Sequence, residues 1–152
     1  MKRWLVRRLY RYLGIPAEDQ GLAFAFMAPI GVLMPNCDPV QPDYIIVLQQ
    51  NVGIIHDRRI WGVPGLIVEV LSPGNKTFDE RIKFLAYAVA GVPEYAIINP
   101  ATRSLNHYRL DSRGRYAYPR TVMIGDTITF DCLPTLSLPI AELFAGAPDT
   151  TP

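Results

Sequence analysis

The segment 66–72, Leu-Ile-Val-Glu-Val-Leu-Ser, restricts the fold of this chain more than any other part of its sequence. Its β-branched apolar residues predict a strand, and apolar and polar positions do not alternate, which indicates that both faces of the strand are buried. Glu69 lies in the middle of this strand, where an ionised carboxylate needs a partner. The ordinary alternative is a glutamate on the solvent face of an edge strand, or one paired with an arginine.

The residues after this strand predict a βαβ unit. A turn at 72–75 leads into a helix over 77–90, with Thr77 as its N-cap and Glu80 completing a capping box. A second apolar strand follows at 94–99. Because a crossover helix joins strands that run in the same direction, we expect the two strands to be parallel neighbours or near neighbours.

The rest of the chain predicts further strands around this unit. A helix is expected at 3–13, ended by Gly14 and Pro16. Strands are expected at 22–27, 30–34, 43–48 and 127–132, a hairpin at 104–110 and 115–122, and a last helical turn at 139–144. The fold class that follows is mixed α/β or α+β, with a mixed central sheet flanked by helices and a C-terminal β-hairpin extension.

Length and composition favour one globular domain over 1–145, followed by a frayed tail at 146–152. Hydrophobic residues make up 49% of the 152, and a net charge of +1 excludes a global electrostatic attraction to nucleic acid. The longest apolar run, 22–34, contains Pro29 and is shorter than the ~20 residues of a membrane-spanning helix. Two isolated cysteines give no disulfide framework, and we expect a cytoplasmic protein without a membrane partner or an organic cofactor.

Two acidic residues suggest a metal site. Asp43 opens an apolar strand directly after Pro42, a position that is also common for a plain strand-start aspartate. Beside Glu69 it gains weight, because two carboxylates on adjacent central strands form a hard-oxygen site for Mg²⁺ or Mn²⁺.

Lys83 is one of three lysines among 15 basic residues. The strand rise carries the chain roughly 10 Å past Glu69, and the helix rise returns it roughly 9 Å, so Lys83 should lie level with Glu69. Asp79, Lys83 and Tyr87 are spaced to share one face of the helix. A solvated Asp79–Lys83 pair is the alternative.

These residues, with several short motifs around them, resemble the Uma-two family of bacterial proteins, which has the restriction-endonuclease-like PD-(D/E)XK fold. The resemblance extends over about 30–140. It is carried by Gln41-Pro42-Asp43, by Gly62-Val63-Pro64-Gly65 with Glu69-Val70-Leu71-Ser72-Pro73, by Asp79, Lys83 and Tyr87, by Gly91-Val92-Pro93-Glu94-Tyr95, by Asn99-Pro100, and by the closing segment 133–139.

The resemblance implies a Mg²⁺- or Mn²⁺-dependent endonuclease that hydrolyses DNA. It assigns metal binding to Asp43, Glu69 and the Val70 carbonyl, catalysis to Asp43, Glu69 and Lys83, and supporting roles to Ser72, Asp79 and Tyr87. The lysine that usually stands two residues after the acid is replaced by Leu71, and Lys83 fits its migrated position. Many relatives carry a glutamate in or before the first helix, whereas this chain has no acidic residue before Glu18.

A non-catalytic DNA-binding or self-association module with the same fold is the second hypothesis. The low charge content and the apolar strands favour a homodimer in either case. The arginines of the first helix could contact phosphates, although a solvated basic face is commoner. These residues are Arg3, Arg7, Arg8 and Arg11.

Overall fold

The computed structural model describes residues 1–72 and 76–150, without the side chains of 76–79. In this part of the chain, six strands form one central sheet in the order β1-β3-β5-β6-β7-β8. The strands are β1 (Ala23–Met27), β3 (Tyr44–Leu48), β5 (Leu66–Val70), β6 (Glu94–Asn99), β7 (Ser104–Arg109) and β8 (Arg120–Val122).

The predicted βαβ unit is confirmed. Strands β5 and β6 are parallel, with Leu66 opposite Glu94 and Val70 opposite Ile98. Helix α3 (Lys76–Ala90) connects them, and the other pairs of the central sheet are antiparallel. Every residue of β5 is buried, as the missing alternation in its sequence predicts. The proposed N-cap Thr77 has its side chain outside the described part, and so does most of the turn at 72–75.

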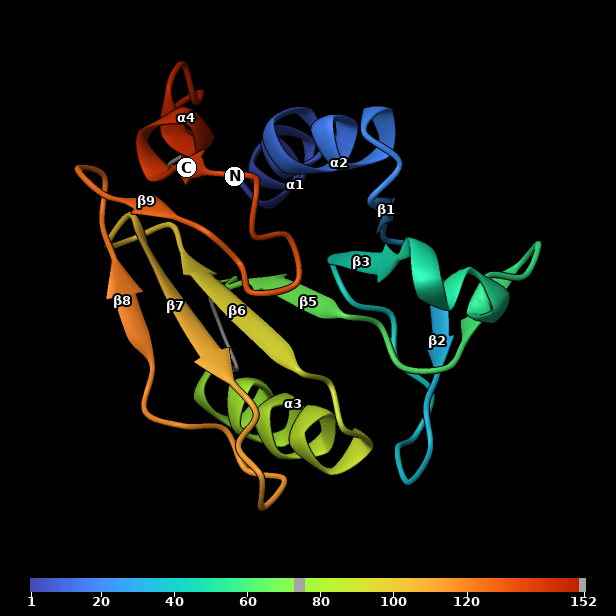
Figure 1. Cartoon of the computed structure of the whole chain (residues 1–152). Coiled ribbons are helices and arrows are strands. Elements are labelled where there is room, and N and C mark those ends of the chain that lie inside the picture. Colours follow the sequence, from blue (N-terminus) through green and yellow to red (C-terminus); the bar gives the residue numbers. More distant parts are fainter. Residues whose placement is uncertain (73–75, 151–152) are drawn as a thin grey trace.

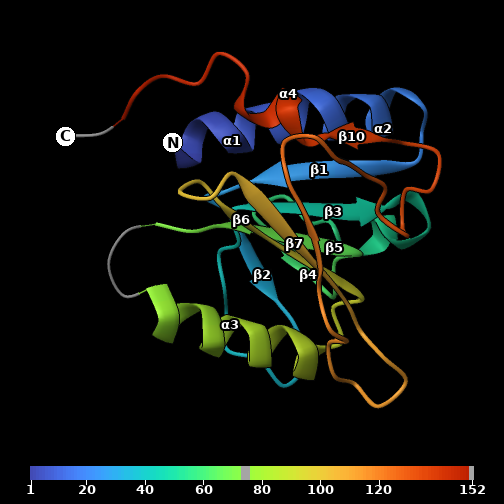
Figure 2. The same ribbon diagram turned by 90° about the vertical axis from the view of Figure 1, so that its left-hand side faces the viewer.

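Helices cover both faces of the sheet (Figures 1 and 2). One face packs against α1 (Lys2–Leu9), α2 (Ile15–Asp19) and α4 (Ile140–Phe144), and α3 covers the other. Each face has its own apolar cluster, the first including Leu5, Val68 and Leu143, the second including Ile67 and Tyr87. This arrangement is the mixed sheet flanked by helices that the sequence predicts.

The prediction that Gly14 and Pro16 end the first helix is wrong. The helical path continues from α1 through a π-helical stretch, Tyr10–Gly14, into α2. Position 14 has no room for a side chain, because a Cβ there would lie 2.6 Å from the Tyr10 ring and 2.9 Å from Ala25 Cβ. Pro16 lies in the first turn of α2, directly after the π-helical stretch.

Smaller elements surround the central sheet. Strand β2 (Gly31–Leu33) pairs in parallel with β4 (Arg59–Trp61), and a 3₁₀ turn, Gln49–Ile54, follows β3. The strand predicted at 127–132 is reduced to β9 (Thr127–Ile128), which pairs with β10 (Leu138–Pro139). It ends early because the N–H groups of Asp131 and Cys132 donate to the Glu94 carboxylate instead of to a neighbouring strand.

The second strand of the predicted hairpin is also shorter than expected, since β8 covers only 120–122 of the predicted 115–122. Its antiparallel pairing with β7 is nevertheless the one expected. Among the described residues, no helix combines the length and the apolar character needed to cross a membrane.

Candidate active site

Asp43 and Glu69 lie next to each other at the same end of the sheet. Tyr44, the first residue of β3, lies opposite Val68 of β5, so the antiparallel register brings Asp43 level with Glu69. Both residues are buried, with exposed fractions of 9% and 4%. Asp43 directly precedes β3, which begins one residue later than the predicted strand at 43–48, and the expectation that the two acids mark adjacent strands is confirmed.

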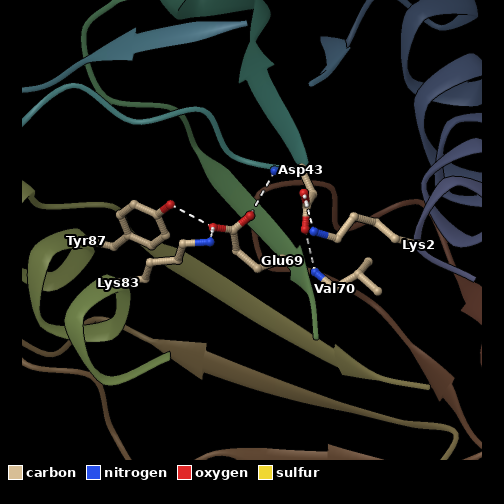
Figure 3. Close-up of polar contacts among 6 residues, drawn as sticks. All are labelled: Lys2, Asp43, Glu69, Val70, Lys83 and Tyr87. Carbon is tan, nitrogen blue, oxygen red and sulfur yellow. Dashed lines mark hydrogen bonds and ion pairs between the residues drawn. The ribbon is translucent and has the colours of Figure 1, made fainter. Parts of the chain in front are cut away.

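Each of the two carboxylates accepts a backbone N–H from the segment that carries the other (Figure 3). The Asp43 N–H donates to Glu69 Oε1 at 2.8 Å, and the Val70 N–H donates to Asp43 Oδ2 at 2.8 Å. These two bonds fix both side chains without using any other side chain. One oxygen of each carboxylate, Asp43 Oδ1 and Glu69 Oε2, is left for other partners.

Helix α3 supplies the partners of Glu69 Oε2. The Tyr87 hydroxyl donates to this oxygen at 2.9 Å, and Lys83 Nζ lies 3.1 Å from it (Figure 3). The two residues are one helical turn apart, and both extend toward Glu69 from the same face of α3. Lys83 thus stands level with Glu69, as the strand and helix rises predict.

Burial raises the pKa of Glu69 above its usual range. The Lys83 ammonium lowers this pKa, the neighbouring Asp43 carboxylate raises it, and the hydrogen bonds from the Asp43 N–H and the Tyr87 hydroxyl lower it. The net effect is upward, so ionisation of Glu69 is less favourable in the protein alone than in water. A cation placed beside the two acids favours the ionised form.

Lys2 is a component of this site that the sequence did not suggest. It lies on α1, on the opposite side of Asp43 from α3, and its Nζ is 3.5 Å from Asp43 Oδ1 (Figure 3). Its side chain is 44% exposed. Lys2 belongs to no motif and is 41 positions away from Asp43, so only the docking of α1 on the sheet brings the two together.

The other predicted site residues have different surroundings. Ser72 is exposed and lines a hollow of about 570 Å³ that Lys2 also borders. Val70 contributes its N–H to Asp43, and ligation by its carbonyl stays a prediction. The side chain of Asp79 lies outside the described part of the structure.

The four arginines of the first helix do not all face the site. Arg3 and Arg7 line a hollow of about 470 Å³ that reaches Asp43. Arg8 instead holds α4, because its Nε donates to the Glu142 carbonyl at 2.8 Å and its side chain is 14% exposed. Arg11 lies over the Tyr12 ring at 5.3 Å. Arg3 and Arg7 are therefore the two that face the site.

The donor set suits a hard divalent cation. Two carboxylates from adjacent strands offer oxygen only, and Mg²⁺ is commonly held by one or two carboxylates with water and substrate phosphate completing its shell. Within the described residues there is no group of three or more His, Cys, Asp and Glu side chains that could hold a metal. The two ammonium groups beside the two carboxylates mark the place where positive charge is needed.

Comparison with known proteins places the chain in a family. The model of the Uma-two family, which is described as "Putative restriction endonuclease", matches residues 2–141. No curated protein matches the chain.

A solved structure shares the fold. It is the crystal structure of a protein from Anabaena variabilis that is described as a "putative nuclease", and it superposes with a TM-score of 0.77 over 95% of this chain and 80% of that one. The two sequences are 16% identical, so the likeness shows the fold.

Proposed function

The chain belongs to the Uma-two family, and from this premise we propose that it is a Mg²⁺- or Mn²⁺-dependent endonuclease that hydrolyses phosphodiester bonds of DNA. The observation that carries the proposal is the pair of buried carboxylates, Asp43 and Glu69, with the Lys83 ammonium 3.1 Å from Glu69. If the Glu69–Lys83 ion pair were purely structural, it would not need Asp43 as a second buried acid beside it.

Asp43 Oδ1 and Glu69 Oε2 are the oxygens that would hold the cation, with the Val70 carbonyl as the further predicted ligand. When bound, the ion supplies Lewis-acid polarisation of the scissile phosphate and a lowered pKa of water. The Val70 N–H holds the Asp43 carboxylate in place, and the Tyr87 hydroxyl does the same for Glu69, so both would be positioned when a cation binds. Lys83 orients the attacking water or balances the charge that develops on the phosphate.

A DNA nicking assay with Mg²⁺ or Mn²⁺ tests this function. We expect slow nicking by the wild type and none by Asp43→Asn or Glu69→Gln. Asp57→Asn, at an exposed position on the loop before β4, is the matched control and should keep the wild-type rate. Thermal melting in the absence of metal should show that both site variants fold. Equal trace nicking by all four proteins would mean contamination and would end the proposal.

One observation favours the second hypothesis, a DNA-binding or self-association module without catalysis. Lys2 and Lys83 already balance the charges of Asp43 and Glu69. A site neutralised in this way could persist without any metal. Calorimetric titration with Mn²⁺ separates the two hypotheses. The enzyme must bind Mn²⁺ and lose this binding in Asp43→Asn, whereas the non-catalytic module need not bind Mn²⁺ at all.

DNA as the substrate is supported by the family description, and the arginines beside Asp43 are placed to contact its phosphates. The homodimer and the cytoplasmic location stay predictions of the sequence. Sedimentation analysis of the purified protein tests the dimer directly.

A further inference from the structure

We propose that Lys2 is a resident counter-cation of Asp43 that a divalent cation displaces, and that the released ammonium then contacts a phosphate of the nucleic-acid substrate. This inference rests on the proposed function, since it needs a metal at Asp43 and Glu69. It goes beyond that function by giving Lys2 a part in both metal and substrate binding.

The contact between Lys2 and Asp43 occupies the oxygen that a metal would need. Asp43 Oδ2 accepts the Val70 N–H at 2.8 Å, which leaves Oδ1 as the oxygen with the greater freedom to bind a cation. Lys2 Nζ lies 3.5 Å from Oδ1. The ammonium and the divalent cation therefore compete for the same atom.

Glu18 of α2 already has hydrogen-bond partners for both of its carboxylate oxygens. Glu18 is the first acidic residue of the chain, and its two carboxylate oxygens accept the Tyr10 hydroxyl at 2.8 Å and the Ala25 N–H at 3.0 Å. The residue that α1 presents to Asp43 is the cationic Lys2. Helix α1 thus supplies the site with a positive charge rather than a ligand.

The energetics favour exchange over a permanent ion pair. An ammonium and a divalent cation within a few ångströms of one oxygen repel each other, and two positive charges beside Mg²⁺ are more than two carboxylates can balance. The Lys2 side chain is 44% exposed, so the ion pair it gives up is a weak, solvated one. Displacement therefore costs little.

The released ammonium has two hollows into which it can turn. One, of about 470 Å³, is bordered by Lys2, Arg3, Arg7 and Asp43, and the other, of about 570 Å³, by Lys2, Ser72 and Asn99. Lys2 is the basic residue that both hollows share. Three cations around the first hollow suit the phosphates of a polynucleotide that passes Asp43.

The exchange couples the two ligands. A metal that displaces Lys2 frees a cation for the substrate, and a phosphate that engages Lys2 frees Asp43 for the metal. By linkage, each ligand raises the affinity for the other by the same factor.

Calorimetric titration of the full chain with Mn²⁺ tests the competition. Lys2→Met keeps the apolar stem and the helix propensity but removes the charge, and we expect it to bind Mn²⁺ roughly three- to tenfold more tightly than the wild type. Lys2→Glu, which adds a carboxylate beside Asp43, should bind more tightly still. Arg113→Met controls for the loss of one positive charge elsewhere, because Arg113 follows β7 beyond the opposite end of the sheet.

The outcomes separate this inference from the proposed function. If wild type and Lys2→Met bind Mn²⁺ equally well, the inference is overturned and the metal site stands. If no variant binds Mn²⁺, the metal site itself is wrong and the inference falls with it. Thermal melting of each variant shows whether it is folded.

Oligonucleotide binding in the presence of Ca²⁺ tests the second part of the proposal, the contact between the released Lys2 ammonium and a phosphate. Lys2→Met should lose roughly three- to tenfold in affinity for a DNA duplex and show a smaller salt dependence, as expected for one phosphate contact, and Arg113→Met should not. If Lys2→Met binds Mn²⁺ more tightly but binds DNA with unchanged affinity, the proposed contact between Lys2 and the substrate phosphate is overturned.

Discussion

Two glutamates are buried in neighbouring strands of the same sheet, and their surroundings differ in almost every respect. Glu69 of β5 faces α3, whose Tyr87 and Lys83 contact it. Glu94 of β6 lies at the other end of the sheet and on the opposite face, beside the loop that carries Asp131 and Cys132. Their exposed fractions are nearly the same, 4% and 3%, so burial alone does not separate them.

Glu94 has partners that all donate to it. His107 Nε2 lies 2.7 Å from Oε1, and the N–H groups of Asp131 and Cys132 donate at 2.7 and 2.8 Å. Because an ionised carboxylate only accepts, His107 Nε2 is the donor in this contact. In the described part of the chain, His107 Nδ1 has no hydrogen-bond partner, and the ring packs edge-on against Phe130. This cluster joins β6, β7 and the C-terminal loop.

The pKa values of the two acids move in opposite directions. Burial raises the pKa of Glu94, but the hydrogen bonds from His107, Asp131 and Cys132 outweigh it and leave the pKa lowered. Burial also raises the pKa of Glu69, and there the neighbouring Asp43 carboxylate adds to the rise. The hydrogen bonds around Glu94 thus stabilise its ionised form, whereas burial and the neighbouring Asp43 carboxylate disfavour the ionised form of Glu69.

The largest effect should come from Lys83. Lys83→Met should lower the single-turnover cleavage rate by roughly 10²–10³-fold, the usual loss for one preorganised charge at a transition state. Mn²⁺ affinity should be nearly unchanged or slightly improved, because loss of a repulsive cation is offset by the rise in the pKa of Glu69. Arg81→Met, on the same helix, is the control. If Lys83→Met cleaves DNA at the wild-type rate, Lys83 is only a structural partner of Glu69.

Next in size is the removal of the charge on Glu94. Glu94→Gln should lower the free energy of unfolding by about 2–3 kcal/mol, because the amide oxygen can replace only one carboxylate oxygen and the NH₂ group cannot accept from the donors that face the other. The folded fraction should cleave DNA at the wild-type rate. Urea unfolding checks the first expectation, and Glu142→Gln, at a 44% exposed carboxylate, should change stability by less than about 0.5 kcal/mol.

A smaller effect is expected from Tyr87. Tyr87→Phe removes the hydroxyl that donates to Glu69 and should lower stability by about 1–2 kcal/mol and weaken Mn²⁺ binding. Tyr116→Phe is the matched control, because its hydroxyl donates to the Val92 carbonyl at 2.9 Å and should leave metal affinity alone. Equal metal affinities in the two variants would show that Tyr87 does not orient the carboxylate.

The smallest effect is a difference in pH dependence measured without metal. Since the folded-state pKa of Glu69 is raised, its contribution to stability is present below the ordinary glutamate pKa and is lost as the pH rises through the folded value. The lowered pKa of Glu94 gives the reverse: its contribution is present at neutral pH and lost as the pH falls.

Urea unfolding in EDTA at a series of pH values checks this opposition. Glu69→Gln should remove the loss of stability that occurs as the pH rises through the folded-state pKa of Glu69. Glu94→Gln should remove the loss that occurs as the pH falls through the folded-state pKa of Glu94. Parallel pH profiles for the two variants would contradict the contrast between the two glutamates.

The sequence determined the centre of this protein. The unbroken apolar run around Glu69, the helical spacing of Lys83 and Tyr87, and the return strand at 94–99 fixed the βαβ unit, because strand burial and the helical repeat are local properties. It also made Asp43 a partner for Glu69, since both acids mark strands that belong in the middle of the sheet.

Tertiary structure alone decided the parts that depend on contacts between distant segments. Gly14 carries the sequence signal of a helix end, yet the helix continues there, and the close approach of Ala25 of β1 leaves no room for a side chain at this position. The sequence does not show that Glu94 would end the strand after Ile128 by taking two N–H groups 37 and 38 residues away. Nor does it show that Lys2 would reach Asp43, because that contact exists only once α1 has docked on the sheet.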